Sequence, residues 1–179
     1  FMAKYFNKCK IYCIEGSKKN YQLLKSNLEI NNGISNLINS FNIVISDKNG
    51  ESKIVDEVST MNIVLENNNE FYGNYSTVAA KTLSRFCNKN FIENIDFMKI
   101  DIEGSELKLL EDLISLPIKL IQIELINANP INDNLKFLDK LSKKYYFYDF
   151  TTHNVIKYKD MVLNLEDHFK KENTIDYFL

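Results

Sequence analysis

The feature that most constrains the fold is a repeated order of apolar run, tight turn and amphipathic helix. Residues 10–15 (KIYCIE) are a short apolar run that ends in a carboxylate, and a Gly-Ser turn follows. Residues 18–31 then carry apolar side chains three or four positions apart, up to an Asn-Asn-Gly stop signal. The same order recurs at residues 95–102 (IDFMKIDI), with Gly104 as the turn and a helix that stops before Pro117. Strands that alternate with helices predict an α/β fold with parallel strands.

The rest of the chain continues this alternation. The further elements that we expect are a strand at 36–45, a hairpin within 51–74, a short helix or a strand with a helical turn at 78–88, a strand at 118–125, a helix at 132–144, a strand at 145–150, and a final strand or hairpin carrying VIKY (155–158) and MVLNL (161–165). A length of 179 residues favours one domain, residues 1–179. We therefore predict a doubly wound, mostly parallel, Rossmann-like sheet with its ligands at the carboxyl ends of the strands.

Composition excludes several classes of protein. The 22 basic and 24 acidic residues give a net charge of −2, which argues against binding of nucleic acid or anionic membrane by bulk electrostatics. The apolar runs fall short of the ~18 residues that a membrane span needs, and residues 1–3 begin no signal peptide. The three cysteines, Cys9, Cys13 and Cys87, are an odd number, which is typical of reduced thiols and a cytoplasmic location.

Glycine is scarce, and no two of the five glycines lie near each other. The chain therefore has neither the GxGxxG turn nor the P-loop that cradle phosphates. Cys9 and Cys13 flank or enter an apolar run, which favours packing over metal binding, and no metal site is predicted.

Glu15 is the first candidate for a binding role. It ends a strand that we expect to be buried and precedes a turn, which is where doubly wound folds place the carboxylate that accepts both hydroxyls of a nucleoside ribose. The alternative is an acid that caps the helix or faces solvent.

A second cluster of acids, Asp101, Glu103 and Glu106, lies across a strand end and the first turn of a helix. Crowded carboxylates can raise the pKa of one of them and make it a general base. Asp101 closes a strand that we expect to be buried, where a carboxylate is costly unless function or hydrogen bonding retains it. For Glu106 we favour a simpler role, in which it complements the helix macrodipole. His153 is interpreted as a surface-loop histidine.

Three segments carry a family resemblance. Residues 97–113, FMKIDIEGSELKLLEDL, resemble the signature of the FkbM-type methyltransferases, class I enzymes that depend on S-adenosylmethionine. Residues 10–32, KIYCIEGSKKNYQLLKSNLEINN, and residues 42–51, NIVISDKNGE, are similar to further parts of that family.

The resemblance implies roles for individual residues. It implies that Glu15 binds the cofactor ribose, with Gly16 and Ser17 in the same turn, and that Ser46 and Asp47 lie beside the adenine. Asp101 and Glu103 would then face the methyl donor and acceptor, and one of them would be the base. The implied acceptor is a hydroxyl group of a sugar, glycan or secondary metabolite.

The family pattern begins with a strand and a glycine-containing loop that cradles the methionine part of the cofactor. Residues 1–8, FMAKYFNK, match the tail of the helix that follows that loop. We therefore expect that the first strand, the cofactor loop and the start of that helix, roughly 20 or more residues, are missing before Phe1. The fold would be N-terminally incomplete, and so would the cofactor site.

Two other functions stay open at this point. A nicotinamide-dependent oxidoreductase also holds its cofactor ribose with a strand-end acid, although the glycine-rich turn of that class is absent. A non-catalytic α/β interaction module would keep the fold without a cofactor. The sequence is compatible with a homo-oligomer.

Overall fold

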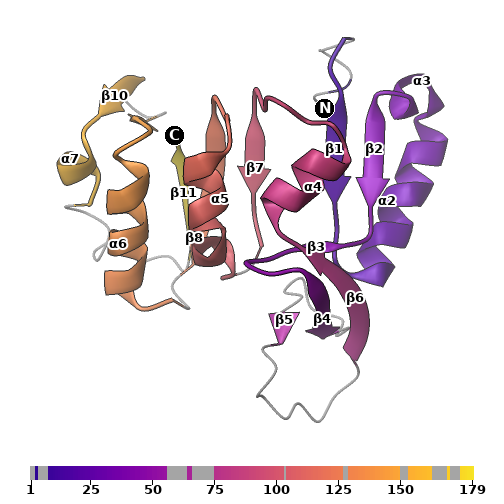
Figure 1. The fold of residues 1–179 in the computed structure, drawn as a ribbon. Helices are drawn as coiled ribbons and strands as arrows, with labels where there is room; N and C mark the ends of the chain where they lie inside the picture. The colour runs from indigo at the N-terminus through magenta and orange to yellow at the C-terminus, as the bar shows by residue number, and fades with distance from the viewer. Residues whose placement is uncertain are drawn as a thin grey trace. The chain divides into compact units, whose positions relative to one another are not determined.

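A computed structural model describes residues 3, 8–55, 64–65, 75–102, 104–126, 129–149, 153–162, 169 and 174–179 (Figure 1). The chain divides into two compact units, Phe1–Lys81 and Thr82–Leu179. The assignment of residues 1–179 to one domain stays a prediction.

The first unit begins with the predicted parallel crossover. Strand β1 pairs in parallel with β2, and two helices connect them (Figure 1). These elements are β1 (Ile11–Ile14), α2 (Lys18–Ile30), α3 (Asn32–Ser35) and β2 (Ile38–Phe41). Helix α2 begins where the sequence predicts because Ser17 is its N-cap, with Oγ accepting a hydrogen bond from the Asn20 backbone N–H at 3.4 Å.

A second sheet of the first unit has the strand order β3-β6-β4-β5. Its strands are β3 (Val44–Ile45), β4 (Gly50–Val55), β5 (Val64–Leu65) and β6 (Tyr75–Lys81). The antiparallel pair β4–β5 confirms the predicted hairpin, and its connecting residues, 56–63, lie outside the described residues. The single strand predicted at 36–45 is wrong in its middle, because the chain leaves the first sheet at Asn42 and enters the second as β3.

The second unit holds a five-stranded sheet of order β10-β9-β11-β8-β7. Its elements are α4 (Leu83–Lys89), β7 (Met98–Ile100), the 3-10 helix η1 (Glu106–Leu109), α5 (Leu110–Ser115), β8 (Ile121–Ile126), α6 (Ile131–Leu141), β9 (Phe147–Asp149), β10 (Asn154–Ile156), α7 (Tyr158–Val162) and β11 (Thr174–Phe178). Strand β8 buries Ile121, Ile123 and Leu125 completely, while the alternate residues Gln122 and Glu124 are half-buried. This period of two places the core of the unit on one face of the sheet.

The prediction of one mostly parallel, doubly wound sheet is wrong in two respects. The described strands form three sheets, and their pairings are parallel in three cases and antiparallel in five. The physical reason is that β11 enters between β8 and β9 in the opposite direction, and that hairpins need antiparallel partners. The fold class is mixed α/β.

Several local predictions have clear outcomes. The strand followed by a helical turn at 78–88 is confirmed by β6 and α4. The strand expected at 161–165 is wrong where the structure describes it, since α7 includes Met161. Strand β11 was not predicted from the sequence at all. Within the described ranges, no helix has the length and apolar character needed to cross a bilayer.

Candidate functional site

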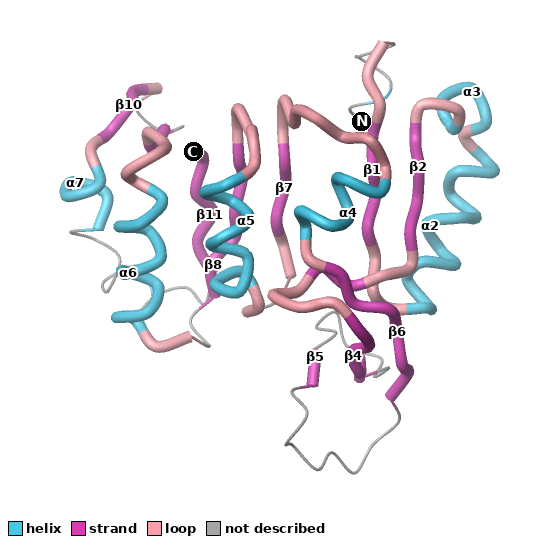
Figure 2. The backbone as a smooth tube through the Cα atoms, in the orientation of Figure 1, coloured by secondary structure: helices cyan, strands magenta, loops and turns pink. Residues whose placement is uncertain are grey.

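Glu15 lies directly after the last residue of β1, Ile14, and before α2. Figure 2 shows the loop that connects these two elements. Its Oε1 accepts a hydrogen bond from the Ser17 backbone N–H at 2.7 Å, and its own N–H donates to the Phe41 carbonyl at 3.0 Å. The side chain is half-buried, and Oε2 has no hydrogen-bond partner among the described residues. The turn therefore fixes one oxygen of the Glu15 carboxylate.

Gly16 and Ser17 have structural tasks within this turn. A Cβ atom on Gly16 would lie 2.5 Å from Ile54 Cδ1 and 2.9 Å from Val44 Cγ2, so neighbouring side chains occupy the space of a larger residue. Ser17 is only 2% exposed, and its hydroxyl caps α2. Their assignment to cofactor binding stays a prediction.

Asn42 is a residue of this turn that sequence reasoning missed. Its Nδ2 donates hydrogen bonds to the carbonyl oxygens of Glu15 and Gly16, each at 2.8 Å. A single side chain thus holds two successive carbonyls beside the Glu15 carboxylate. The available signal was an Asn, a typical turn residue, inside the apolar run at 36–45.

Ser46 and Asp47 follow β3 in the second sheet of the first unit. Ser46 donates its backbone N–H to the Lys81 carbonyl at 2.9 Å and its hydroxyl to Asp47 Oδ1 at 3.0 Å. Asp47 is exposed. No hydrogen bond joins this pair to Glu15 among the described residues. The assignment of Ser46 and Asp47 to the adenine stays a prediction.

Asp101 lies just beyond the end of β7 in the second unit. Ile100 is buried, as expected for the strand, but the Asp101 side chain is 40% exposed and pairs with Lys99 Nζ at 2.5 Å. The expected burial of Asp101 is therefore wrong, because a lysine two residues earlier on the strand neutralises it at an accessible strand end. The hydrogen bond that Lys99 Nζ donates to Asp101 raises the pKa of Lys99, and the nearby carboxylates of Glu124 and Asp176 add to that shift.

Glu106 was expected to lie at the surface and to interact favourably with the helix dipole, but the structure shows a different environment. The residue is 0% exposed, and its Oε1 accepts hydrogen bonds from the backbone N–H groups of Ile102 and Gly104, each at 3.1 Å. Gly104 has φ +92°, which confirms that its position needs a backbone conformation that other residues resist. Glu103, the second predicted catalytic acid, lies outside the described residues. His153 is exposed in a turn, as predicted.

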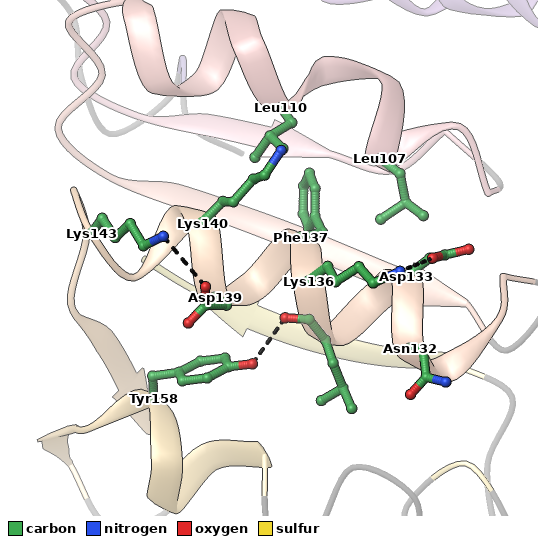
Figure 3. Close-up of a pocket in the computed structure, with 11 residues that line it drawn as sticks. Leu107, Leu110, Asn132, Asp133, Lys136, Phe137, Asp139, Lys140, Lys143 and Tyr158 are labelled. Atoms are coloured by element: carbon green, nitrogen blue, oxygen red, sulfur yellow. Dashed lines mark hydrogen bonds and ion pairs between the residues drawn. The ribbon is translucent and has the colours of Figure 1, made fainter.

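A groove of about 610 Å³ lies elsewhere in the second unit, beside η1, α5, α6 and α7 (Figure 3). Its charged side chains are largely paired with each other, through Lys136–Asp133 at 3.3 Å and Lys143–Asp139 at 3.5 Å. None of the predicted site residues lines it. The part of the chain that the structure describes contains no cluster of residues able to hold a metal ion.

Comparison with known proteins gives one match. Residues 1–155 match the family model described as the methyltransferase FkbM domain. Searches of curated proteins and of solved structures found no match.

Proposed function

Because the chain belongs to the FkbM methyltransferase family, we propose that it is an S-adenosylmethionine-dependent O-methyltransferase. The proposed acceptor is a hydroxyl group of a sugar, glycan or secondary metabolite. The family match covers the segments that hold Glu15 and Asp101, and it favours this function over an oxidoreductase or a non-catalytic module. The odd number of cysteines, Cys9, Cys13 and Cys87, supports a reducing, cytoplasmic compartment.

The observation that carries the cofactor assignment is the geometry of Glu15. A ribose presents two neighbouring hydroxyl groups, which a single carboxylate can accept. The Ser17 N–H and the Asn42 amide hold this turn in place, while Oε2 of Glu15 is open among the described residues. The residues present therefore fit the nucleoside part of the cofactor.

S-adenosylmethionine supplies, when bound, a methyl group activated by a positively charged sulfur. The chain's own contribution is to position the reactants and to take up the proton that the acceptor hydroxyl loses. Asp101 is the proposed base, because it is a carboxylate at the carboxyl end of a strand with 40% of its side chain exposed. Lys99 orients this carboxylate through their ion pair.

Isothermal titration calorimetry on the complete gene product tests the proposal. Glu15→Ala should raise the Kd for S-adenosylmethionine roughly 10- to 100-fold, since hydrogen bonds to a charged group contribute about 1.5–3 kcal/mol. Glu29→Ala is the matched control, because Glu29 is an exposed acid on α2. A wild-type protein that binds NADH but not S-adenosylmethionine would refute the function. Unchanged affinity in Glu15→Ala would refute the role of Glu15.

A further inference from the structure

Glu106 is the one buried carboxylate among the described residues. Its exposed fraction is 0%, whereas Asp101 and Asp112 on the neighbouring segments are not buried. Taking a carboxylate out of water is costly unless hydrogen bonds satisfy it. We therefore expect a specific role for this buried acid, which begins a helix and follows the candidate catalytic residue Asp101 closely in the sequence.

The contacts of Glu106 define that task. Its Oε1 accepts the N–H groups of both Ile102 and Gly104 at 3.1 Å. Gly104 is also held at its carbonyl oxygen, which accepts a hydrogen bond from Asn129 Nδ2 at 3.3 Å. The backbone that leaves β7 is thus fixed at two N–H groups and one carbonyl by side chains.

This anchoring reaches Asp101 through the covalent backbone. The N–H of Ile102 belongs to the same planar peptide group as the carbonyl of Asp101, so a hydrogen bond to that N–H restricts the ψ angle of Asp101. The Asp101 side chain is held separately by Lys99. Backbone and side chain of Asp101 therefore each have their own restraint.

We propose that Glu106 is a positioning residue for methyl transfer, which acts by fixing the backbone that carries Asp101. The inference rests on the proposed function, because Asp101 is the base in that proposal. Glu106 itself contacts neither cofactor nor acceptor. Its loss should therefore lower kcat while the Kd for S-adenosylmethionine changes little.

Two substitutions of similar volume separate anchoring from packing. Glu106→Gln keeps an oxygen that accepts both N–H groups, whereas Glu106→Leu removes the acceptor. Hydrogen bonds to a neutral acceptor are weaker than those to a carboxylate, so Glu106→Gln should lower kcat by at most about threefold and Glu106→Leu by tenfold or more. Leu113→Ala is the control, because Leu113 is fully buried on α5 and its loss lowers stability without touching these hydrogen bonds.

Amide hydrogen exchange by NMR provides a readout that does not depend on activity. Relative to the amides of β8, the amides of Ile102 and Gly104 should exchange about tenfold faster in Glu106→Leu but not in Leu113→Ala. Unchanged exchange in Glu106→Leu would overturn the anchoring. Faster exchange with wild-type kcat would overturn the positioning role.

Two further outcomes are informative. If Glu106→Leu does not fold, Asn129→Ala removes the restraint on the Gly104 carbonyl from a side chain that is only half-buried. It should lower kcat with an unchanged melting temperature, and wild-type kcat would contradict the proposal. A wild-type protein without methyltransferase activity would refute the proposed function and with it the catalytic part of this inference, while the exchange data would still decide whether Glu106 anchors the backbone.

Discussion

Replacing Gly16 by alanine should destabilise the protein, although glycine-to-alanine changes often do the reverse. The new Cβ would lie 2.5 Å from Ile54 Cδ1 and 2.9 Å from Val44 Cγ2, both far inside van der Waals contact. Ile54 is 2% exposed, so its side chain has little room to turn away. Val44 carries its methyl groups on Cβ, so relief there requires a shift of β3.

The expected size of the effect follows from this crowding. Overpacking in a dense core costs about 1–3 kcal/mol. For a chain of this length, each kcal/mol lowers the melting temperature by roughly 2–4 °C, so Gly16→Ala should melt about 2–12 °C below wild type. Gly33→Ala is the matched control, because nothing lies within 4 Å of its Cβ position and it sits in helix α3. That variant should gain about 0.5–1 kcal/mol.

Thermal and urea unfolding of the two variants, followed by circular dichroism, measure this difference. The double variant Gly16→Ala/Ile54→Val removes the closer of the two contacts and should recover part of the loss, with a coupling energy of about 0.5 kcal/mol or more. Equal stability of Gly16→Ala and Gly33→Ala would show that the core around Gly16 accommodates a Cβ atom. In that case packing would not explain the glycine at position 16, and only its predicted role in cofactor binding would remain.

Two other variants test separate features. Asn42→Ala should lose two hydrogen bonds to the Glu15 turn, which lowers stability by about 1–3 kcal/mol and weakens S-adenosylmethionine binding in calorimetry; an Asn42→Ala variant with wild-type affinity would show that this turn needs no anchor. The Tyr177 hydroxyl is buried without a hydrogen-bond partner in the described part of the chain, and burial raises its pKa well above the ordinary value of 10.0. The stability that comes from keeping this phenol neutral is fully present below pH 10 and is lost as the pH rises above it. Tyr177→Phe should therefore match or exceed wild-type stability at pH 7 and lose less of it between pH 9 and 11 in melting experiments, and an equal loss in both proteins would contradict this assignment.

Local patterns predicted the strand–turn–helix units because their signals are local. The run at 10–15, the Ser17 cap and the helix after it correspond to β1 and α2, and the run at 95–102 contains β7. Strand pairing is not local, and no rule of periodicity indicates that Thr174–Phe178 lies between β8 and β9. A mostly parallel sheet was therefore predicted, whereas most of the described pairings in the three sheets are antiparallel.

The site shows the same division between local and tertiary information. Glu15 lies at its predicted strand end because the strand and the turn are encoded next to each other. The roles of Asn42 and Glu106 depend on which backbone groups the fold brings to their side chains, and spacing alone does not contain that information. Asp101 was expected to be buried because it closes an apolar strand. Its exposure and its ion pair with Lys99 depend on how the side chains are arranged in the fold, which the apolar pattern does not specify.

A crystal structure of the complete gene product with S-adenosylhomocysteine tests the central claim most directly. We expect the two ribose hydroxyl groups to donate hydrogen bonds to the Glu15 carboxylate, with the Asn42 amide still bonded to the Glu15 and Gly16 carbonyls. A well-ordered ligand whose ribose lies away from Glu15 would contradict the assignment of this turn to the cofactor.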